Sequence, residues 1–147
     1  MGRYASVLAF HGDDVVLVRE SYPAWGGSFW SLPSGAVGQS ESPSDGAARE
    51  LREETGVVVA ADDLALISTT ATRSATAQST AWNYRARVGS CVLDPDDPDG
   101  LIEAARWFSI TAAIEALEQL PYEPLRVPAV TYLRDGHQAI REWSFIV

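Results

Sequence analysis

The chain has 147 residues, of which 46% are hydrophobic and 21% charged, and this composition is typical of one globular domain with a core of its own. We therefore expect residues 1–147 to form a single domain. The formal net charge of −9 at pH 7 argues against a nucleic-acid partner, because proteins that bind phosphate backbones usually present basic surfaces.

Cysteine content and hydropathy bear on the cellular compartment. The single cysteine, Cys91, excludes an internal disulfide, and the residues after Met1 lack the long apolar stretch of a secretory signal. No apolar run approaches the roughly 20 residues that a membrane-spanning helix needs. We expect a cytoplasmic protein that does not enter a membrane.

The first part of the chain is predicted to form a hairpin. Residues 4–10 and 15–19 are apolar or rich in β-branched residues, and residues 11–14 have the composition of a hairpin turn. Residues 21–34 are rich in proline, glycine and aromatic residues and are predicted to form a loop with a short strand.

A helix is predicted over residues 43–55 from the signals at its two ends. Ser42 can cap the free backbone amides, and Pro43 suits the first helical position. Asp45 favours the positive end of the helix dipole, and Gly56 suits the end of the helix.

The second half is expected to add strands and two further helices to a mixed sheet. The expected strands cover residues 57–59, 64–70, 82–88 and 105–108. The expected helices cover residues 111–120 and 128–138, and the aspartate-rich segment 94–100 is expected to be a solvated turn. The last residues, 142–147, fit either core or an interface.

The helix over residues 43–55 gathers carboxylates on one side. At 100° per residue, Glu50, Glu53 and Glu54 fall within an arc of about 100°, while Ala47 and Leu51 lie on a separate arc. Glu50 and Glu54 are one helical turn apart, and their like charges repel each other unless a cation lies between them. Carboxylate oxygens suit Mg²⁺ or Mn²⁺, and Mg²⁺ also binds substrate phosphates. The cluster indicates metal-assisted phosphate chemistry, with a solvated acidic face as the alternative.

A longer motif decides between these two interpretations. Gly35 is followed after five residues by Glu41, and after seven more by the run Arg49-Glu50-Leu51-Arg52-Glu53-Glu54-Thr55-Gly56-Val57. This spacing matches every fixed position of the signature of the Nudix hydrolase family, which the protein resembles. The resemblance implies an α/β/α sandwich with a mixed sheet and a catalytic loop-helix-loop.

The resemblance also assigns roles by position. It implies that the ligands of Mg²⁺, or of Mn²⁺, are Glu50, Glu53 and Glu54, with Gly35 offering its carbonyl oxygen or serving only as a turn glycine. Glu41 and Arg49 are expected to pair and to hold the loop against the helix, so that the ligands stay oriented.

A carboxylate must accept a proton from the attacking water, and the resemblance allows it to come from the signature or from another loop. Our candidates are Glu50 and Glu103, with a solvated glutamate as the alternative for Glu103.

Several other residues are weighed as candidates for substrate contact. Cys91, His11 and His137 are expected to be ordinary packing or surface residues. The aromatic residues Trp25, Phe29, Trp82 and Tyr84 can stack on a nucleobase, and the arginines Arg73, Arg85 and Arg87 can touch phosphate, with packing or surface roles as the alternative.

The sequence thus predicts a metal-dependent pyrophosphohydrolase that cleaves a diphosphate linkage in a nucleoside diphosphate derivative or a nucleoside triphosphate. The alternative is a binding module that senses a nucleotide without cleaving it. Hydrolysis of RNA ends is disfavoured by the acidic charge. The partner is expected to be a small nucleotide or other diphosphate compound, and because relatives often pair, a homodimer stays open.

Overall fold

The computed structural model describes residues 1–90, 92–136 and 139–147. Within this part of the chain, eight strands form one mixed sheet in the order β3-β2-β1-β6-β5-β8, with β4 added beside β1 and β7 beside β2. The strands are β1 (Gly2–His11), β2 (Asp14–Tyr22), β3 (Gly27–Ser31), β4 (Ser34–Ala36), β5 (Ala65–Arg73), β6 (Gln78–Arg87), β7 (Ile102–Ser109) and β8 (Arg141–Ile146). The β1–β6 and β5–β8 pairs are parallel, and the other pairs are antiparallel.

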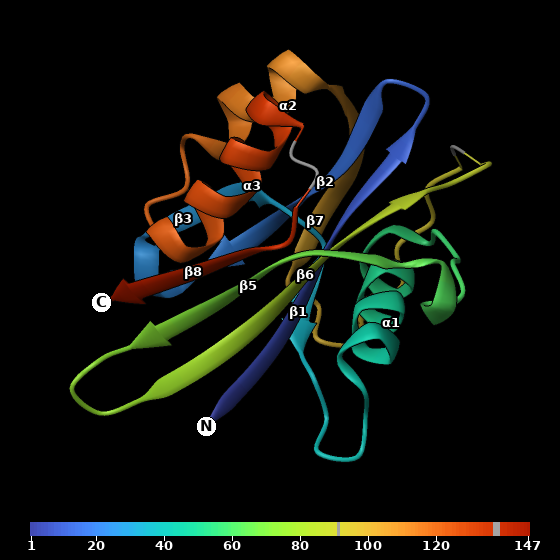
Figure 1. The fold of residues 1–147 in the computed structure, drawn as a ribbon. Helices are drawn as coiled ribbons and strands as arrows, with labels where there is room; N and C mark the ends of the chain where they lie inside the picture. Colours follow the sequence, from blue (N-terminus) through green and yellow to red (C-terminus); the bar gives the residue numbers. More distant parts are fainter. Residues whose placement is uncertain (91, 137–138) are drawn as a thin grey trace.

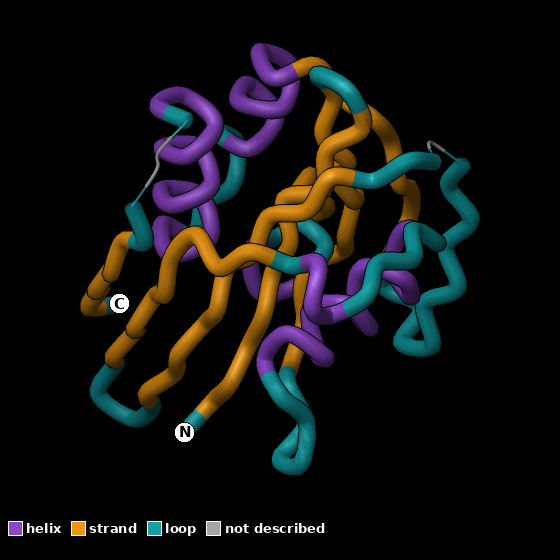
Figure 2. The backbone as a smooth tube through the Cα atoms, turned by 45° about the vertical axis from the view of Figure 1, so that its right-hand side comes forward, coloured by secondary structure: helices purple, strands orange, loops and turns teal. Residues whose placement is uncertain are grey.

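Helices cover both faces of this sheet (Figure 1). Helix α1 (Pro43–Thr55) lies on one face, and α2 (Ile110–Leu117) and α3 (Glu123–Asp135) lie together on the other. Figure 2 shows the same layers from another side, with strands running between the helices. The expected α/β/α sandwich is confirmed. None of the described helices is long and apolar enough to cross a membrane.

The two layers follow from the period-two alternation of the strands. On β1, Val7 and its neighbours two residues away pack against Leu51 of α1, while Leu8 faces the other way and packs with Leu117 of α2. Ala47 and Leu51 are fully buried. The apolar arc predicted for this helix is therefore the arc that packs on the sheet.

Helix α1 has the predicted bounds and the predicted ends. The Ser42 side chain accepts a hydrogen bond from the Asp45 backbone amide, and Pro43 is the first helical residue. Gly56 follows the helix with φ of 81°, a left-handed conformation that glycine adopts at little cost, and its amide donates to the Arg52 carbonyl.

Two predicted elements are wrong in type or extent. Residues 57–59 form no strand and connect α1 to a short 3₁₀ turn (Ala61–Asp63). Val57 is buried in the core on the α1 side, whereas Val58 is 76% exposed. The apolar run is therefore a connection that is attached to the core through Val57. The last helix begins at Glu123, before residue 128, because Pro124 lies in its first turn, where no amide is needed.

The C-terminal segment that the sequence left open is an edge strand. β8 pairs in parallel with β5 and has no partner strand on its other side in the described part of the chain. Cys91, His137 and the predicted helix end at Gln138 lie outside the described residues.

Candidate active site

The backbone of β4 lies directly against two glutamates of α1. The Ser34 backbone amide donates a hydrogen bond of 2.9 Å to Glu54 Oε1. A Cβ atom added to Gly35 would lie 2.3 Å from both Cδ and Oε1 of Glu50, so the Glu50 carboxylate would have to move. Glycine at this position therefore allows the strand backbone to touch the Glu50 carboxylate.

Both of these carboxylates are buried. Glu50 is 9% exposed and Glu54 is 4% exposed. Burial raises the pKa of Glu54 to about 9, and the nearby charges of Glu20, Glu50 and Asp97 add to this against the opposing hydrogen bond from Ser34. The pKa of Glu50 is also raised, chiefly by burial, although its pairing with Arg49 opposes the rise. A cation bound here would favour the ionised forms.

Arg49 binds the loop before α1 and two glutamates of the helix itself. Its guanidinium donates to both oxygens of Glu41 at 2.9 and 3.0 Å and to the Ala36 carbonyl at 2.9 Å. It also donates to Glu50 Oε1 at 2.9 Å and to Glu53 Oε2 at 3.2 Å. The hydrogen bonds from Arg49 lower the pKa of Glu41 to about 2. Arg49 and Glu41 are thus in contact, and their role in orienting metal ligands stays a prediction.

The donor chemistry of the site fits a hard divalent cation. Glu50, Glu53, Glu54 and the Gly35 carbonyl supply oxygens, and the close approach at Gly35 brings a backbone carbonyl segment beside a carboxylate. No three acidic, histidine or cysteine side chains of the described residues converge into a preformed metal cluster. In this structure the Arg49 guanidinium neutralises Glu50 and Glu53 instead.

Glu20 is an acidic neighbour that the sequence analysis missed. It lies on β2 opposite Phe29 of β3. Burial raises its pKa, the charges of Asp97 and Asp99 raise it further, and the Tyr22 hydroxyl opposes them. Its own charge contributes to the raised pKa of Glu54. The strand period alone does not identify it, because the register of β2 against β7 shifts between Arg19 and Glu20 and so interrupts the two-residue steps from Val16 and Val18.

The aspartate-rich segment packs against the end of α1. The Asp94 amide donates to the Thr55 carbonyl at 2.9 Å, and the Asp96 amide donates to the Glu53 carbonyl at 2.8 Å. The Asp97 carboxylate accepts from backbone amides later in its own turn, including that of Leu101 at 2.8 Å. The segment is a turn as expected, and it places negative charge beside the α1 glutamates.

Glu103 makes different contacts. Its carboxylate accepts a 2.5 Å hydrogen bond from Ser28 Oγ and lies 3.5 Å from Arg19 Nε. Its side chain is 46% exposed. A role as base or ligand for Glu103 stays a prediction, whereas Glu20 and Asp97 are carboxylates outside the signature that interact with Glu54.

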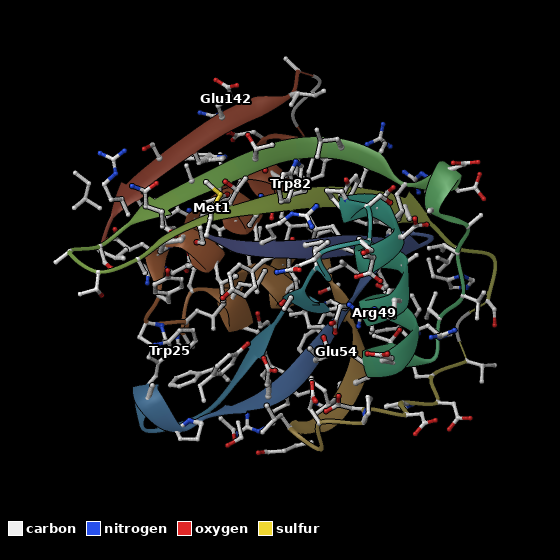
Figure 3. All side chains as sticks on the ribbon, turned by 90° about the horizontal axis from the view of Figure 1, so that it is seen from below. Met1, Trp25, Arg49, Glu54, Trp82 and Glu142 are labelled. Atoms are coloured by element: carbon white, nitrogen blue, oxygen red, sulfur yellow. The ribbon has the colours of Figure 1, made fainter. Side chains whose placement is uncertain are left out.

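A cavity of about 530 Å³ adjoins the acidic site. It reaches from Glu20 and Gly35 across the sheet to Trp25 and Tyr122. Figure 3 shows Trp25 at the end of the sheet far from Arg49 and Glu54. The cavity therefore connects Glu20 and the β4 backbone, which contacts Glu50 and Glu54, to an aromatic wall.

The aromatic and arginine candidates separate clearly. Trp25 and Tyr84 line the cavity, and Phe29 packs beside Trp25 with ring centroids 6.5 Å apart. Trp82 packs in the core on the α1 side, where Arg3 lies over its ring at 5.6 Å. The three arginines weighed as phosphate contacts are exposed and lie outside the cavity lining, namely Arg73, Arg85 and Arg87.

Comparison with known proteins agrees with the motif. A family model described as NUDIX domain matches residues 2–128. None of the curated proteins matches the sequence. Among solved structures, the chain is similar to a NUDIX hydrolase from Nitrosomonas europaea, with a TM-score of 0.77 and 17% identity over 99% of this chain and 79% of that one.

Two further structures carry ligand information in their descriptions. The NUDIX domain of Shewanella oneidensis NrtR, complexed with ADP ribose, has a TM-score of 0.72 and 19% identity over 91% of this chain and 86% of that one. An Ap4A hydrolase binary complex from C. elegans has a TM-score of 0.67 and 17% identity over 91% and 93%. At these identities the similarity to solved structures shows a shared fold.

Proposed function

The chain belongs to the NUDIX family, whose hydrolases act on phosphoric anhydrides, and we propose that it is a metal-dependent pyrophosphohydrolase. Its substrate would be a nucleoside diphosphate derivative or a nucleoside triphosphate, cleaved at a diphosphate linkage by water attack at phosphorus. One observation carries the proposal: Glu50 and Glu54, both buried, lie against the β4 backbone at the edge of a cavity.

The residues that would hold the metal are Glu50, Glu53 and Glu54, together with the Gly35 carbonyl. We propose Mg²⁺, with Mn²⁺ as a substitute, because all of these donors are oxygens. When bound, a divalent cation would neutralise charge on the bridging phosphates and lower the pKa of a coordinated water.

The chain's own residues perform the other tasks. Arg49 fixes the loop before α1 and so keeps the glutamates oriented. A carboxylate must accept the proton of the attacking water, and the candidates are Glu50 and Glu103, joined by Glu20 from the structure. Glu20 is proposed because it lines the cavity and its charge acts on Glu54.

The alternative function is a nucleotide sensor without turnover. It is favoured by one observation, namely that the Arg49 guanidinium forms ion pairs with Glu50 and Glu53, two of the carboxylates that would hold a metal. A sensor would use the same cavity but would release no product.

The deciding experiment is product release across a panel of nucleoside diphosphate compounds and nucleoside triphosphates. Each compound is incubated with Mg²⁺, with Mn²⁺ and with EDTA, and phosphate and nucleoside monophosphate are quantified. Metal-dependent release of a monophosphate product is the expected result. Binding across the panel without release in any condition would establish the sensor instead.

Two coarser attributes accompany the proposal. The single cysteine in the sequence supports a cytoplasmic location. A homodimer is proposed only as a state to be measured, by light scattering of the purified protein, and the catalytic argument does not depend on it.

A further inference from the structure

Buried polar side chains interrupt the sheet face that α3 covers. Ser68 and Thr70 of β5, Asn83 of β6 and Ser6 of β1 lie side by side there, with Ser68 opposite Asn83 and Ser6 opposite Asn83 in the strand registers. Ser6, Ser68 and Thr70 are 4%, 5% and 2% exposed. Polar groups in such a position lose contact with water and need partners.

Asn83 supplies a partner for each of these hydroxyls. The Ser6 hydroxyl donates to Asn83 Oδ1 at 2.8 Å. The Asn83 amide nitrogen donates to Ser68 Oγ at 2.9 Å and to Thr70 Oγ1 at 3.1 Å. Both amide hydrogens are therefore used, and Ser68 and Thr70 each accept one bond while keeping their own hydroxyl hydrogen.

These residues face the cavity that adjoins the acidic site. Ser6, Ser68, Thr70 and Asn83 all belong to its lining. Because Ser68 and Thr70 already accept from Asn83, the hydrogen that each can still offer is a donor. This region of the cavity wall therefore presents donors to a ligand.

The cavity is otherwise neutral. Among its lining residues in the described part of the chain, Glu20 is the one charged side chain, and it lies at the acidic end. Beyond Tyr22, whose hydroxyl interacts with Glu20, Trp25 is stacked between Tyr22 and Tyr122, with ring centroids 4.3 and 5.4 Å away. Phosphates therefore belong at the acidic end, with a metal, and an uncharged flat group belongs in the remainder of the cavity.

We propose that Ser68 and Thr70, positioned by Asn83, select the uncharged group of the substrate by donating hydrogen bonds to it. This inference rests on the proposed function and names a substrate class: nucleotides whose base carries a carbonyl oxygen where a counterpart carries an amino group. An amino group could donate to the remaining lone pair of each hydroxyl but would leave the hydroxyl hydrogens without an acceptor, and unpaired buried polar groups discriminate between ligands.

The test compares two pairs of nucleotides that differ in this group and in whether the adjacent ring nitrogen carries a hydrogen. Uridine triphosphate is compared with cytidine triphosphate, and inosine triphosphate with adenosine triphosphate, all with Mg²⁺. Binding is measured by calorimetry and turnover as kcat/KM. The expected result for the unmodified protein is a preference of about five- to tenfold for the carbonyl-bearing member of each pair.

Thr70→Val removes one donor and keeps the side-chain shape. We expect it to reduce the preference severalfold through KM, with kcat retained. Thr69→Val is the matched control, because Thr69 is the adjacent residue of β5 and pairs with Trp82, which packs on the α1 side. It should leave the preference unchanged. Thermal unfolding of both variants shows whether each one folds.

The outcomes separate this inference from the proposed function. Equal binding within both pairs, or the same preference in Thr70→Val and Thr69→Val, overturns the inference even if the protein hydrolyses every compound. A preference in binding without turnover supports the inference and overturns the hydrolase. A preference for the amino-bearing members shows that the hydroxyls donate to Asn83, and it also overturns the inference.

Discussion

The most informative single substitution is Glu54→Gln, because it separates the electrostatic cost of the buried carboxylate from its chemical role. Burial raises the pKa of Glu54 from 4.5 to about 9. At pH 7 this group is therefore protonated in the folded chain and ionised in the unfolded chain. The protein therefore has its full free energy of unfolding, as far as Glu54 is concerned, below pH 4.5, and this free energy decreases progressively as the pH rises towards 9.

The magnitude follows from the pKa difference. One pKa unit corresponds to about 1.4 kcal/mol, so the group lowers the free energy of unfolding by about 3 kcal/mol at pH 7. Glutamine never ionises, and its carbonyl oxygen can keep the hydrogen bond from the Ser34 amide. Its buried amino group finds no assigned partner and costs about 1 kcal/mol. The net expected gain at pH 7, without metal, is about 2 kcal/mol.

The assay is thermal unfolding of the unmodified protein and of Glu54→Gln, in EDTA and in Mg²⁺, from pH 4 to pH 9. In EDTA at pH 7 the variant should unfold roughly 4 to 8 °C higher. The difference should disappear near pH 4 and grow towards pH 9. Added Mg²⁺ should raise the Tm of the unmodified protein and leave the variant unchanged, while turnover of the variant is abolished.

Two results would refute this reasoning. If Glu54→Gln is less stable than the unmodified protein at pH 8 in EDTA, the carboxylate is stabilising there and burial does not control its pKa. If Mg²⁺ stabilises the variant as much as the unmodified protein, Glu54 is not a metal ligand.

Three further predictions test the surroundings. Gly35→Ala should reduce turnover strongly and destabilise the fold by about 1 to 3 kcal/mol, because its Cβ would overlap the Glu50 carboxylate. Chemical denaturation and turnover measurements check this prediction. Gly27→Ala is the control, because a Cβ added at Gly27 meets nothing within 4 Å. Arg49→Lys should raise the pKa of Glu41 back towards its ordinary range. In the unmodified protein, the ionised Glu41 carboxylate stabilises the fold above pH 4.5, and this stability is lost as the pH falls towards 2. The variant should have less of this stability, which acid unfolding curves will show. Glu103→Gln should lower turnover by roughly 10² or more if that residue is the base, whereas an unchanged rate would remove it as a candidate.

The sequence predicted best where local signals act alone. Helix α1 has its predicted bounds because a serine cap, a proline at the first position and a left-handed glycine are all local features. The strand predicted over residues 57–59 does not form. Its apolar residues belong to a connection that is partly buried, and hydropathy does not distinguish a buried connection from a buried strand. The early start of α3 was missed because Pro128 suits the first turn of a helix, whereas in the structure Pro128 lies inside α3 and Pro124 occupies the first turn.

The site shows the same division. The signature placed Gly35, Glu50 and Glu54 in one motif, and the structure brings all three into contact through β4. The sequence did not identify Glu20 or Asn83, because each is joined to its neighbours through strand pairing. Ser6, for example, reaches Asn83 across 77 residues of chain. Register between distant strands is a tertiary property, and no local pattern encodes it.

The net charge of −9 acquires a more specific meaning in this structure. Negative charge near the catalytic helix is not spread evenly, because Glu20, Glu50, Glu54 and Asp97 act on one another closely enough to raise pKa values. A polyphosphate alone would be repelled from this end of the cavity, whereas the neutral end imposes no such barrier. Phosphate binding should therefore require a cation at the acidic end, and recognition of the uncharged group should depend on hydrogen bonding and stacking. If the proposed function holds, the two halves of one substrate would be held by different physical forces in different parts of one cavity.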